Sequence, residues 1–510
     1  MPESENKKSH FLLGDISETE QFSPPRLRID TPNIPQPNRH QHGSRLLGNI
    51  ETIRSLMDEA RIIQQNAGLD EGLGLQVEFE SIPEVELAFE SLARDNSGIE
   101  LLNVRKSENK TLATVIQDSN AWSEYPSSNT TDGIHDPGQA WNALTIGAFT
   151  NLVDIAEDDA ENYQPIAPAG GLSPFSTTSA TWEQRWPIKP DIVLEGGNAA
   201  NDGLGAVWLP SLSLLTCHND LTQRLFTTIN ATSAATAIAC QMAAELKVAY
   251  PALWPESVRA LMVHSSEWSD AMKKIYLPDE RSPNKNDYLY LIRHCGFGVP
   301  NLDRALWSMS NSLVMIVETD LQPFQREPQR QPKLKDMNLH KLPWPLEELE
   351  ALGETEVEMR VTLSYFIEPN PSNRGFKSKY RYESHGLRFD VKRPLESVDD
   401  FRSRINRLAR LEEERSRHNG DDPNWLIGTQ KRHRGSLHSD IWKGNAADLA
   451  SRGVIAVYPT LGWWKTRTAL GRYNNKTRYS LIVSIHAPEV DVDLYTTVQN
   501  QIETPVKITS

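Results

Sequence analysis

An alanine-rich run that begins with a threonine and a serine is the feature that most constrains this fold. It reads Ala231-Thr-Ser-Ala-Ala-Thr-Ala-Ile-Ala239 and continues through Ala243-Ala244. Serine and threonine are favoured where helices begin, and alanine has the highest helix propensity. We therefore predict a helix over residues 232–247 whose small side chains allow close packing beneath a sheet. A second helix is predicted at 255–264, where Pro255 suits a first turn.

The segments around these helices indicate an α/β domain. Strand-like apolar runs at 143–149 and 192–194 lie among loops rich in glycine and proline. Strands that alternate with helices are typical of a parallel sheet covered by helices. We assign this α/β domain to residues 117–322.

The first 116 residues predict a small α+β module behind a proline-rich, extended arm at 1–40. Apolar residues recur at helical spacing between Arg45 and Asn66, which predicts a helix there. The rest of the module is predicted to hold a strand at 75–80, a helix at 85–93, and strands at 101–104 and 112–116.

The C-terminal part, residues 323–510, predicts a linker followed by a β-sandwich. The segment 323–355 is charged and rich in proline, which indicates the linker. Apolar residues then alternate with polar ones at 358–365, 478–485 and 489–494. A period of two predicts half-buried strands, and several of them favour a sandwich. One charged helix is predicted at 399–415.

Composition excludes several classes of function. The net charge of -15 argues against a general nucleic-acid role, because phosphate binding requires a basic surface. No stretch approaches the roughly 20 apolar residues of a membrane span. The three cysteines, Cys217, Cys240 and Cys295, form neither a disulfide framework nor a metal-ligand pattern. No cofactor is predicted. Because no apolar run follows the N-terminal lysines, we expect a cytoplasmic protein.

Five segments around Ser233 resemble those of the subtilisin-like serine peptidases, the subtilases. In that family the nucleophile lies in Gly-Thr-Ser-x-Ala at the start of a helix, and Asn230-Ala-Thr-Ser-Ala234 is similar. The flanking matches, in chain order, are Trp141-Asn-Ala-Leu-Thr-Ile-Gly-Ala148, Leu172-Ser-Pro-Phe-Ser176, Lys189-Pro-Asp-Ile-Val-Leu-Glu-Gly-Gly-Asn198, Trp254-Pro-Glu-Ser-Val-Arg-Ala-Leu261 and Gly296-Phe-Gly-Val-Pro-Asn-Leu-Asp-Arg304.

The resemblance implies hydrolysis of peptide or protein substrates through an acyl-enzyme on Ser233. The N-terminal module and the β-rich tail also resemble those of a large bacterial cytoplasmic group of subtilases, which implies an ATPase partner. The motif departs from the family at Ala231, where a glycine is expected. Alanine restricts positive φ and close substrate approach, so the change argues against efficient catalysis.

The histidine and aspartate that would activate Ser233 have no clear match before it. A serine triad needs a histidine base and a carboxylate that orients it. Asp30 and His42 are similar in spelling to the family motifs. They lie too close together for the intervening strand, however, and we interpret them as an arm residue and a helix-start residue. His135 and His218 are interpreted as loop residues, and His264 as a helix residue.

Asn120 is the only candidate for the asparagine of the oxyanion hole, the alternative being an ordinary loop residue. The module before residue 117 leads almost directly into what resembles the second half of a subtilase domain. We infer that the first half, which carries the aspartate and the histidine in the family, is absent. One or more strands of the N-terminal module are expected to cover the exposed sheet edge.

Three hypotheses follow from the sequence. The first is a serine endopeptidase with impaired or lost activity. The second is a non-catalytic peptide-binding or regulatory pseudo-peptidase. The third is a non-functional truncated product. The fold prediction common to them is an α/β protein: a partial subtilisin-like domain between a small α+β module and a β-sandwich.

Overall fold

The computed structural model describes residues 122–487 except 136, 184–185, 279–281, 307–311, 343, 371–380 and 415–421, together with strand positions near both ends of the chain. The chain divides into two units, Met1–Ile99 and Glu100–Ser510. In the first unit, β1 (Leu27–Arg28) pairs in parallel with β2 (Val77–Glu78), which lies within the strand predicted at 75–80. The helices predicted at 45–66 and 85–93 and the strand predicted at 112–116 fall outside the described residues.

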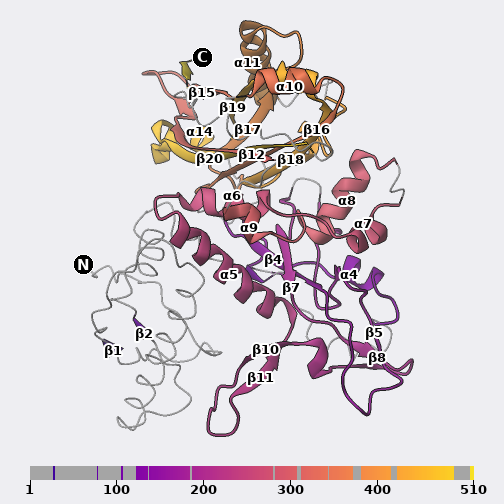
Figure 1. Cartoon of the computed structure of the whole chain (residues 1–510). Helices are drawn as coiled ribbons and strands as arrows, with labels where there is room; N and C mark the ends of the chain where they lie inside the picture. The colour runs from indigo at the N-terminus through magenta and orange to yellow at the C-terminus, as the bar shows by residue number, and fades with distance from the viewer. Residues whose placement is uncertain are drawn as a thin grey trace, which may run out of the picture. The chain divides into compact units, whose positions relative to one another are not determined.

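A small parallel sheet forms the centre of the α/β part (Figure 1). In it β4 (Thr145–Thr150) pairs in parallel with β7 (Ile192–Glu195), close to the predicted strands. At the other edge of β4 lie β3 (Arg105–Lys106), in parallel, and β6 (Gly171–Leu172), antiparallel. β3 lies in the second unit, Glu100–Ser510, so the expectation that strands of an N-terminal module cover the sheet edge stays a prediction.

The alanine-rich run forms α5 (Ala231–Ala249), and α6 (Pro255–His264) follows it, so both predicted helices are confirmed. Helix α5 packs against β4 and β7. Ala235 and Ala239 are fully buried there, in one apolar cluster with Ile146 and Ile192. The close contact of a helix with a sheet requires such small side chains, as the sequence predicted.

The other elements of this part are short. They are α4 (Ser127–Thr131), β5 (Gln164–Pro165), β8 (Ala200–Asn201), β9 (Ala206–Val207), η1 (Pro210–Leu212), β10 (Leu214–Cys217), β11 (Phe226–Ile229), α7 (Asp270–Tyr276), α8 (Lys285–Cys295) and α9 (Leu302–Leu306). The helix starts follow local rules: the Ser269 side chain accepts a hydrogen bond from the Met272 N–H, and Asn284 and Asp287 form a capping box at α8.

The C-terminal part is a sandwich of two four-stranded antiparallel sheets. The first has the order β12-β20-β16-β18: β12 (Ser312–Leu321), β20 (Thr477–His486), β16 (Glu356–Tyr365) and β18 (Leu437–Asn445). The second has the order β17-β19-β15-β21: β17 (Gly386–Val391), β19 (Val454–Thr460), β15 (Asp336–Lys341) and β21 (Val506–Thr509). Alternate side chains of both sheets share one apolar core.

The segment predicted as a linker, 323–355, is instead structured, and that prediction is wrong. It holds β13 (Phe324–Gln325), β14 (Lys333–Leu334), β15 and α10 (Leu346–Leu352). Its proline and charge content indicated a linker, but β15 gains its hydrogen bonds from β19, more than 100 residues later. The remaining elements are α11 (Val398–Glu414), which confirms the charged helix, α12 (Thr429–Arg432), α13 (Ala446–Ala450), α14 (Trp463–Thr466), η3 (Thr468–Leu470) and η4 (Arg472–Asn474).

The strands predicted at 358–365 and 478–485 are confirmed as β16 and β20, but the prediction that they are half-buried is wrong. The polar side chains of Arg360, Thr362 and Ser364 in β16 are buried as well, because this face of the sheet packs on α6. The Arg360 guanidinium donates to the carbonyls of His264 and Ser266, the latter over 2.5 Å. Buried polar groups must be paired, so the alternation reflects an apolar face and a polar interface.

Arg259 of α6 is the most heavily bonded side chain of this interface. Its guanidinium donates to the carbonyls of Trp141, Asn142, Tyr365 and Ser436 at 2.7–3.2 Å and to the Ser364 hydroxyl at 3.1 Å. Burial lowers the pKa of Arg259 to about 10, so it stays charged near neutral pH. The buried Arg259 guanidinium therefore links the α/β part to the sandwich.

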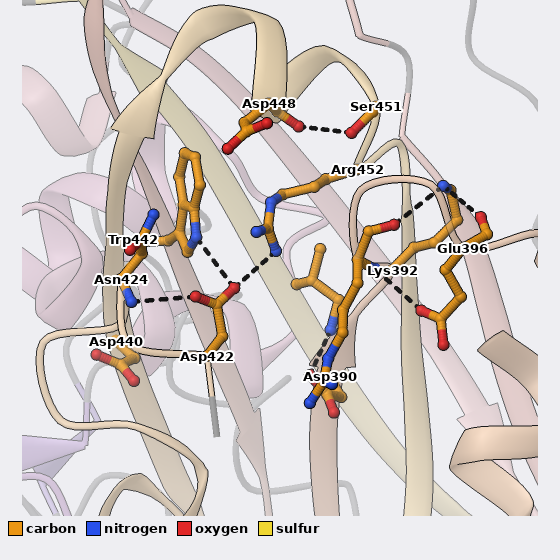
Figure 2. A network of polar contacts seen from close by, with 12 residues as sticks. Asp390, Lys392, Glu396, Asp422, Asn424, Asp440, Trp442, Asp448, Ser451 and Arg452 are labelled. Carbon is orange, nitrogen blue, oxygen red and sulfur yellow. Dashed lines mark hydrogen bonds and ion pairs between the residues drawn. The ribbon is translucent and has the colours of Figure 1, made fainter. Parts of the chain in front are cut away.

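A second buried network fixes the end of the sandwich near α8. Figure 2 shows the Asp422 carboxylate between the Trp442 indole and the Arg452 guanidinium, which lies 2.8 Å away. The guanidinium also stacks over the Trp442 ring. The Lys285 ammonium of α8 donates to the Asp422 carbonyl, so this network is another link between the two parts.

Candidate active site around Ser233

Ser233 lies in the first turn of α5, directly after β11 and Asn230. Its side chain is half-buried. Within the described part of the chain, its hydroxyl has no hydrogen-bond partner. The first N–H groups of a helix lack intrahelical partners and carry partial positive charge. A hydroxyl in this place is therefore held on a rigid element beside groups able to stabilise negative charge.

The residue two positions before Ser233 has the backbone of a glycine. Ala231 has a φ of 63°, in the left-handed region that costs a residue with a Cβ about 1–2 kcal/mol. Its N–H donates to the Gly196 carbonyl over 2.6 Å, which holds this turn against the end of β7. Ala231 thus has a left-handed backbone that glycine adopts without this cost.

The loop after β7 approaches α5 closely enough to require glycine. A Cβ on Gly196 would lie 2.5 Å from the Ala148 Cβ and 3.0 Å from the Ala231 carbonyl oxygen. The Ser173 hydroxyl donates to the Gly197 carbonyl over 2.7 Å, and the Ala148 N–H donates to the Ser176 hydroxyl. The segment 172–176 therefore binds both the sheet and the loop beneath Ser233.

A buried ion pair anchors the strand that precedes this loop. The Lys189 ammonium lies 2.6 Å from the Asp191 carboxylate and donates to the Ala143 carbonyl, and the Thr145 N–H donates to the same carboxylate. Burial lowers the pKa of Lys189, and the adjacent Asp191 carboxylate opposes this shift. Lys189 is only 2% exposed. The pair therefore has a structural role, joining β4 to β7.

The closing stretch predicted at 296–304 completes the arrangement. The Phe297 N–H donates to the Asp191 carbonyl, and the Val193 N–H donates to the Gly298 carbonyl. The segment therefore runs beside β7, and α6 packs against α5. The structure thus brings the flanking segments of the motif together around the sheet and α5.

Asn198, at the end of the Lys189 segment, is held by four hydrogen bonds. Its amide nitrogen donates to the carbonyls of Leu152 and Ala167, and its amide oxygen accepts from the N–H groups of Ala167 and Ala199. All its bonding capacity is directed at the backbone, so Asn198 shapes the loop and does not face a substrate.

The histidine of α6, His264, is bonded away from Ser233. The His264 imidazole lies between the hydroxyls of Thr362 and Ser484 at 2.9 and 2.8 Å, within the interface with the sandwich. Burial holds the pKa of His264 well below its usual range. It is a helix residue, as predicted. His135 and His218 lie in loops, also as predicted. In the described residues, no imidazole bonds to the Ser233 hydroxyl.

Asn120, Asp30 and His42 lie outside the described residues, so their predicted roles stay predictions. Among the residues that the structure describes, no three His, Cys, Asp or Glu side chains are grouped as metal ligands. No helix of that part is long and apolar enough to cross a membrane.

A family model described as the Subtilase family matches residues 95–298. This segment belongs to the subtilase family. It spans β3 to the start of the closing stretch and includes Ser233. The mixed α/β fold agrees with a subtilisin-like domain. A search of curated proteins finds no match.

Two solved structures are similar to parts of this chain. A protease of Pseudoalteromonas arctica PAMC 21717 has 14% identity and a TM-score of 0.21, over 39% of this chain and 48% of its own. The serine protease of Aeromonas sobria has 13% identity and a TM-score of 0.19, over 76% of this chain and 70% of its own. The chain thus spans about half the length of the first of these proteins.

Sequence reasoning missed the hairpin of β10 and β11, which leads into the start of α5. A signal for it was present. Two short runs with β-branched or large apolar residues, 214–217 and 226–229, flank a polar loop that contains Asn219 and Asp220.

Proposed function

We propose that this subtilase is a serine peptidase of impaired activity, in which Ser233 attacks the peptide carbonyl to form an acyl-enzyme. The observation that carries the proposal is the position of Ser233. Its hydroxyl lies in the first turn of α5, after the left-handed residue Ala231, and has no hydrogen-bond partner among the residues that the structure describes. Peptides or proteins are the substrates that the family implies. The cytoplasmic location and the ATPase partner stay predictions from the sequence.

Impairment follows from the surroundings of the hydroxyl. A serine needs a base within about 3 Å to become a nucleophile. Within the described range, histidines such as His264 are committed to other partners. Peptidases that lose a triad member keep only about 10³–10⁴-fold acceleration over water, from binding and oxyanion stabilisation. We expect turnover of that low order.

A fluorophosphonate probe tests this proposal, because it reacts with activated serines. We expect slow labelling of Ser233 in the full chain, located by mass spectrometry of the peptide, and no labelling in Ser233→Ala. Ser211→Ala is the matched control, because the Ser211 hydroxyl also has a polar setting but bonds to Glu157. Labelling as rapid as that of an active serine peptidase would refute impairment.

The second candidate is a peptide-binding protein without turnover. The bonding of His264 to partners other than Ser233 favours it, since a site that lacks a base can bind a peptide without cutting it. Stoichiometric binding of casein fragments, together with no labelling of Ser233 and no cleavage of casein, would support this alternative over the first.

A further inference from the structure

The hairpin of β10 and β11 forms a separate two-stranded sheet next to Ser233. Among the described strands, β10 and β11 pair only with each other. Figure 1 shows the hairpin extending away from the parallel sheet. β11 ends at Ile229, and only Asn230 separates it from α5. A two-stranded hairpin is marginal by itself, and a third strand would stabilise it.

The hydrogen-bonding register shows which backbone groups face outward. Beyond the strand ends, the His218 N–H donates to the Leu225 carbonyl. In an antiparallel pair, bonded and non-bonded residue pairs alternate. The next pair, Cys217 with Phe226, is therefore non-bonded, and so is Leu215 with Thr228. The N–H and C=O groups of Phe226 and Thr228 consequently point away from β10, along the outer edge of β11.

One face of the hairpin is apolar and open to solvent. Leu215, Cys217 and Phe226 lie on the same face, because the register pairs Cys217 with Phe226 and residues two apart share a face. Leu215 is 71% exposed and Phe226 is 49% exposed. The two strands carry no charged side chain. Exposed apolar patches of this kind mark interaction sites.

We propose that the outer edge of β11 binds an extended polypeptide with apolar side chains at alternate positions, as an added strand. The free backbone groups require an extended partner, and the apolar face selects its side chains. The occupant is a polypeptide substrate because a strand on β11 runs beside the segment that leads directly to Ser233. The inference rests on the proposed function, and it adds the class of substrate: unfolded, apolar segments.

The test measures binding apart from catalysis, in the full-length Ser233→Ala variant. The probe is a fluorescein-labelled ten-residue peptide in which valine and lysine alternate, followed by fluorescence anisotropy. Its matched control is the same peptide with N-methyl groups on the amides of one edge. We expect saturable binding of the first peptide and at least about tenfold weaker binding of the second, since N-methylation removes the edge hydrogen bonds.

Variants on the protein side test the apolar face. Phe226→Thr keeps a strand-forming residue and should weaken binding by about tenfold, because it removes apolar contact area. Leu204→Thr is the matched control: Leu204 is 92% exposed and lies outside the hairpin, so its change should leave binding unaltered. Thermal melting checks that each variant folds, and the N-methylated peptide tests the edge without any variant.

Three outcomes would overturn the inference. Equal binding of both peptides would show that no strand is added. If the peptide bound equally well to Phe226→Thr and to its parent, the apolar face would have no role in binding. A concentration-dependent dimer that Phe226→Thr abolishes would assign the edge to a second copy of this chain. Lack of fluorophosphonate labelling together with retained peptide binding would refute the proposed function alone.

Discussion

Replacing Ala231 by glycine removes a strained backbone conformation and little else. Its φ of 63° costs a residue with a Cβ about 1–2 kcal/mol, and glycine pays none of this. The loss is one half-buried methyl group, worth at most about 0.8 kcal/mol. Glycine also gains entropy in the unfolded chain, which lowers stability at any position. The local strain must therefore be separated from this general effect.

Ala237→Gly supplies the separation. Ala237 is exposed on the same helix, and glycine there should lower the free energy of unfolding by about 1 kcal/mol. The unfolded-state entropy is common to both variants, so the difference between them reports the strain at Ala231. We expect Ala231→Gly to be the more stable variant by about 1 kcal/mol. Urea unfolding followed by tryptophan fluorescence measures this, and equal losses would refute the reasoning.

Three further predictions concern one buried histidine and two buried charged side chains. Burial lowers the pKa of His438 from 6.5 to about 3. As the pH falls, His438 therefore binds a proton in the unfolded chain before it does so in the folded chain. The free energy of unfolding decreases as the pH drops from 6.5 towards 3. His438→Phe should flatten the pH dependence of urea unfolding by about 1.4 kcal/mol per pH unit, and an unchanged slope would contradict this. Arg259→Leu should destabilise the full chain by about 3–5 kcal/mol, because it leaves buried carbonyls unpaired, whereas the exposed Arg330→Leu should change stability by under about 0.5 kcal/mol; thermal melting compares the two. Lys189→Met should lower the free energy of unfolding by about 3–5 kcal/mol, because it leaves the buried Asp191 carboxylate without its cation. Adding Asp191→Asn to this variant should restore part of the lost stability. If urea unfolding shows that the effects of the two changes simply add, the two side chains are not coupled.

The sequence predicted those elements that local chemistry determines. Pro255 and the alanine-rich run set the bounds of α6 and α5 closely, because a first-turn proline and helix propensity act locally. The alternation of β16 gave the strand, but it could not show what covers the polar face. That depends on α6, which lies about 100 residues earlier. β15 was missed for a similar reason, since its partners are distant in sequence.

The sequence predicted which segments gather around the start of α5, while the role of Ser233 stays a prediction. The five flanking segments do pack around the sheet and α5, and the substitution at Ala231 was visible in the sequence. Its left-handed backbone was not, because it depends on the approach of Gly196 from another strand. The similarity of short motifs to those of the family did not identify a base for Ser233. The interpretation of Asp30 and His42 as residues outside a triad remains a prediction from the sequence.

The interface between α6 and the sandwich sets an order of events during synthesis. The Ser257 hydroxyl bonds to Ser480, 223 residues later, and His264 bonds to Ser484, 220 residues later. At about 5–20 residues per second, a ribosome needs roughly 10–45 s to make that stretch. Throughout this interval, Ser257 and His264 of α6 lack the hydrogen-bond partners that β20 will supply. The nascent α/β part therefore completes its packing against the sandwich only once β20 has emerged.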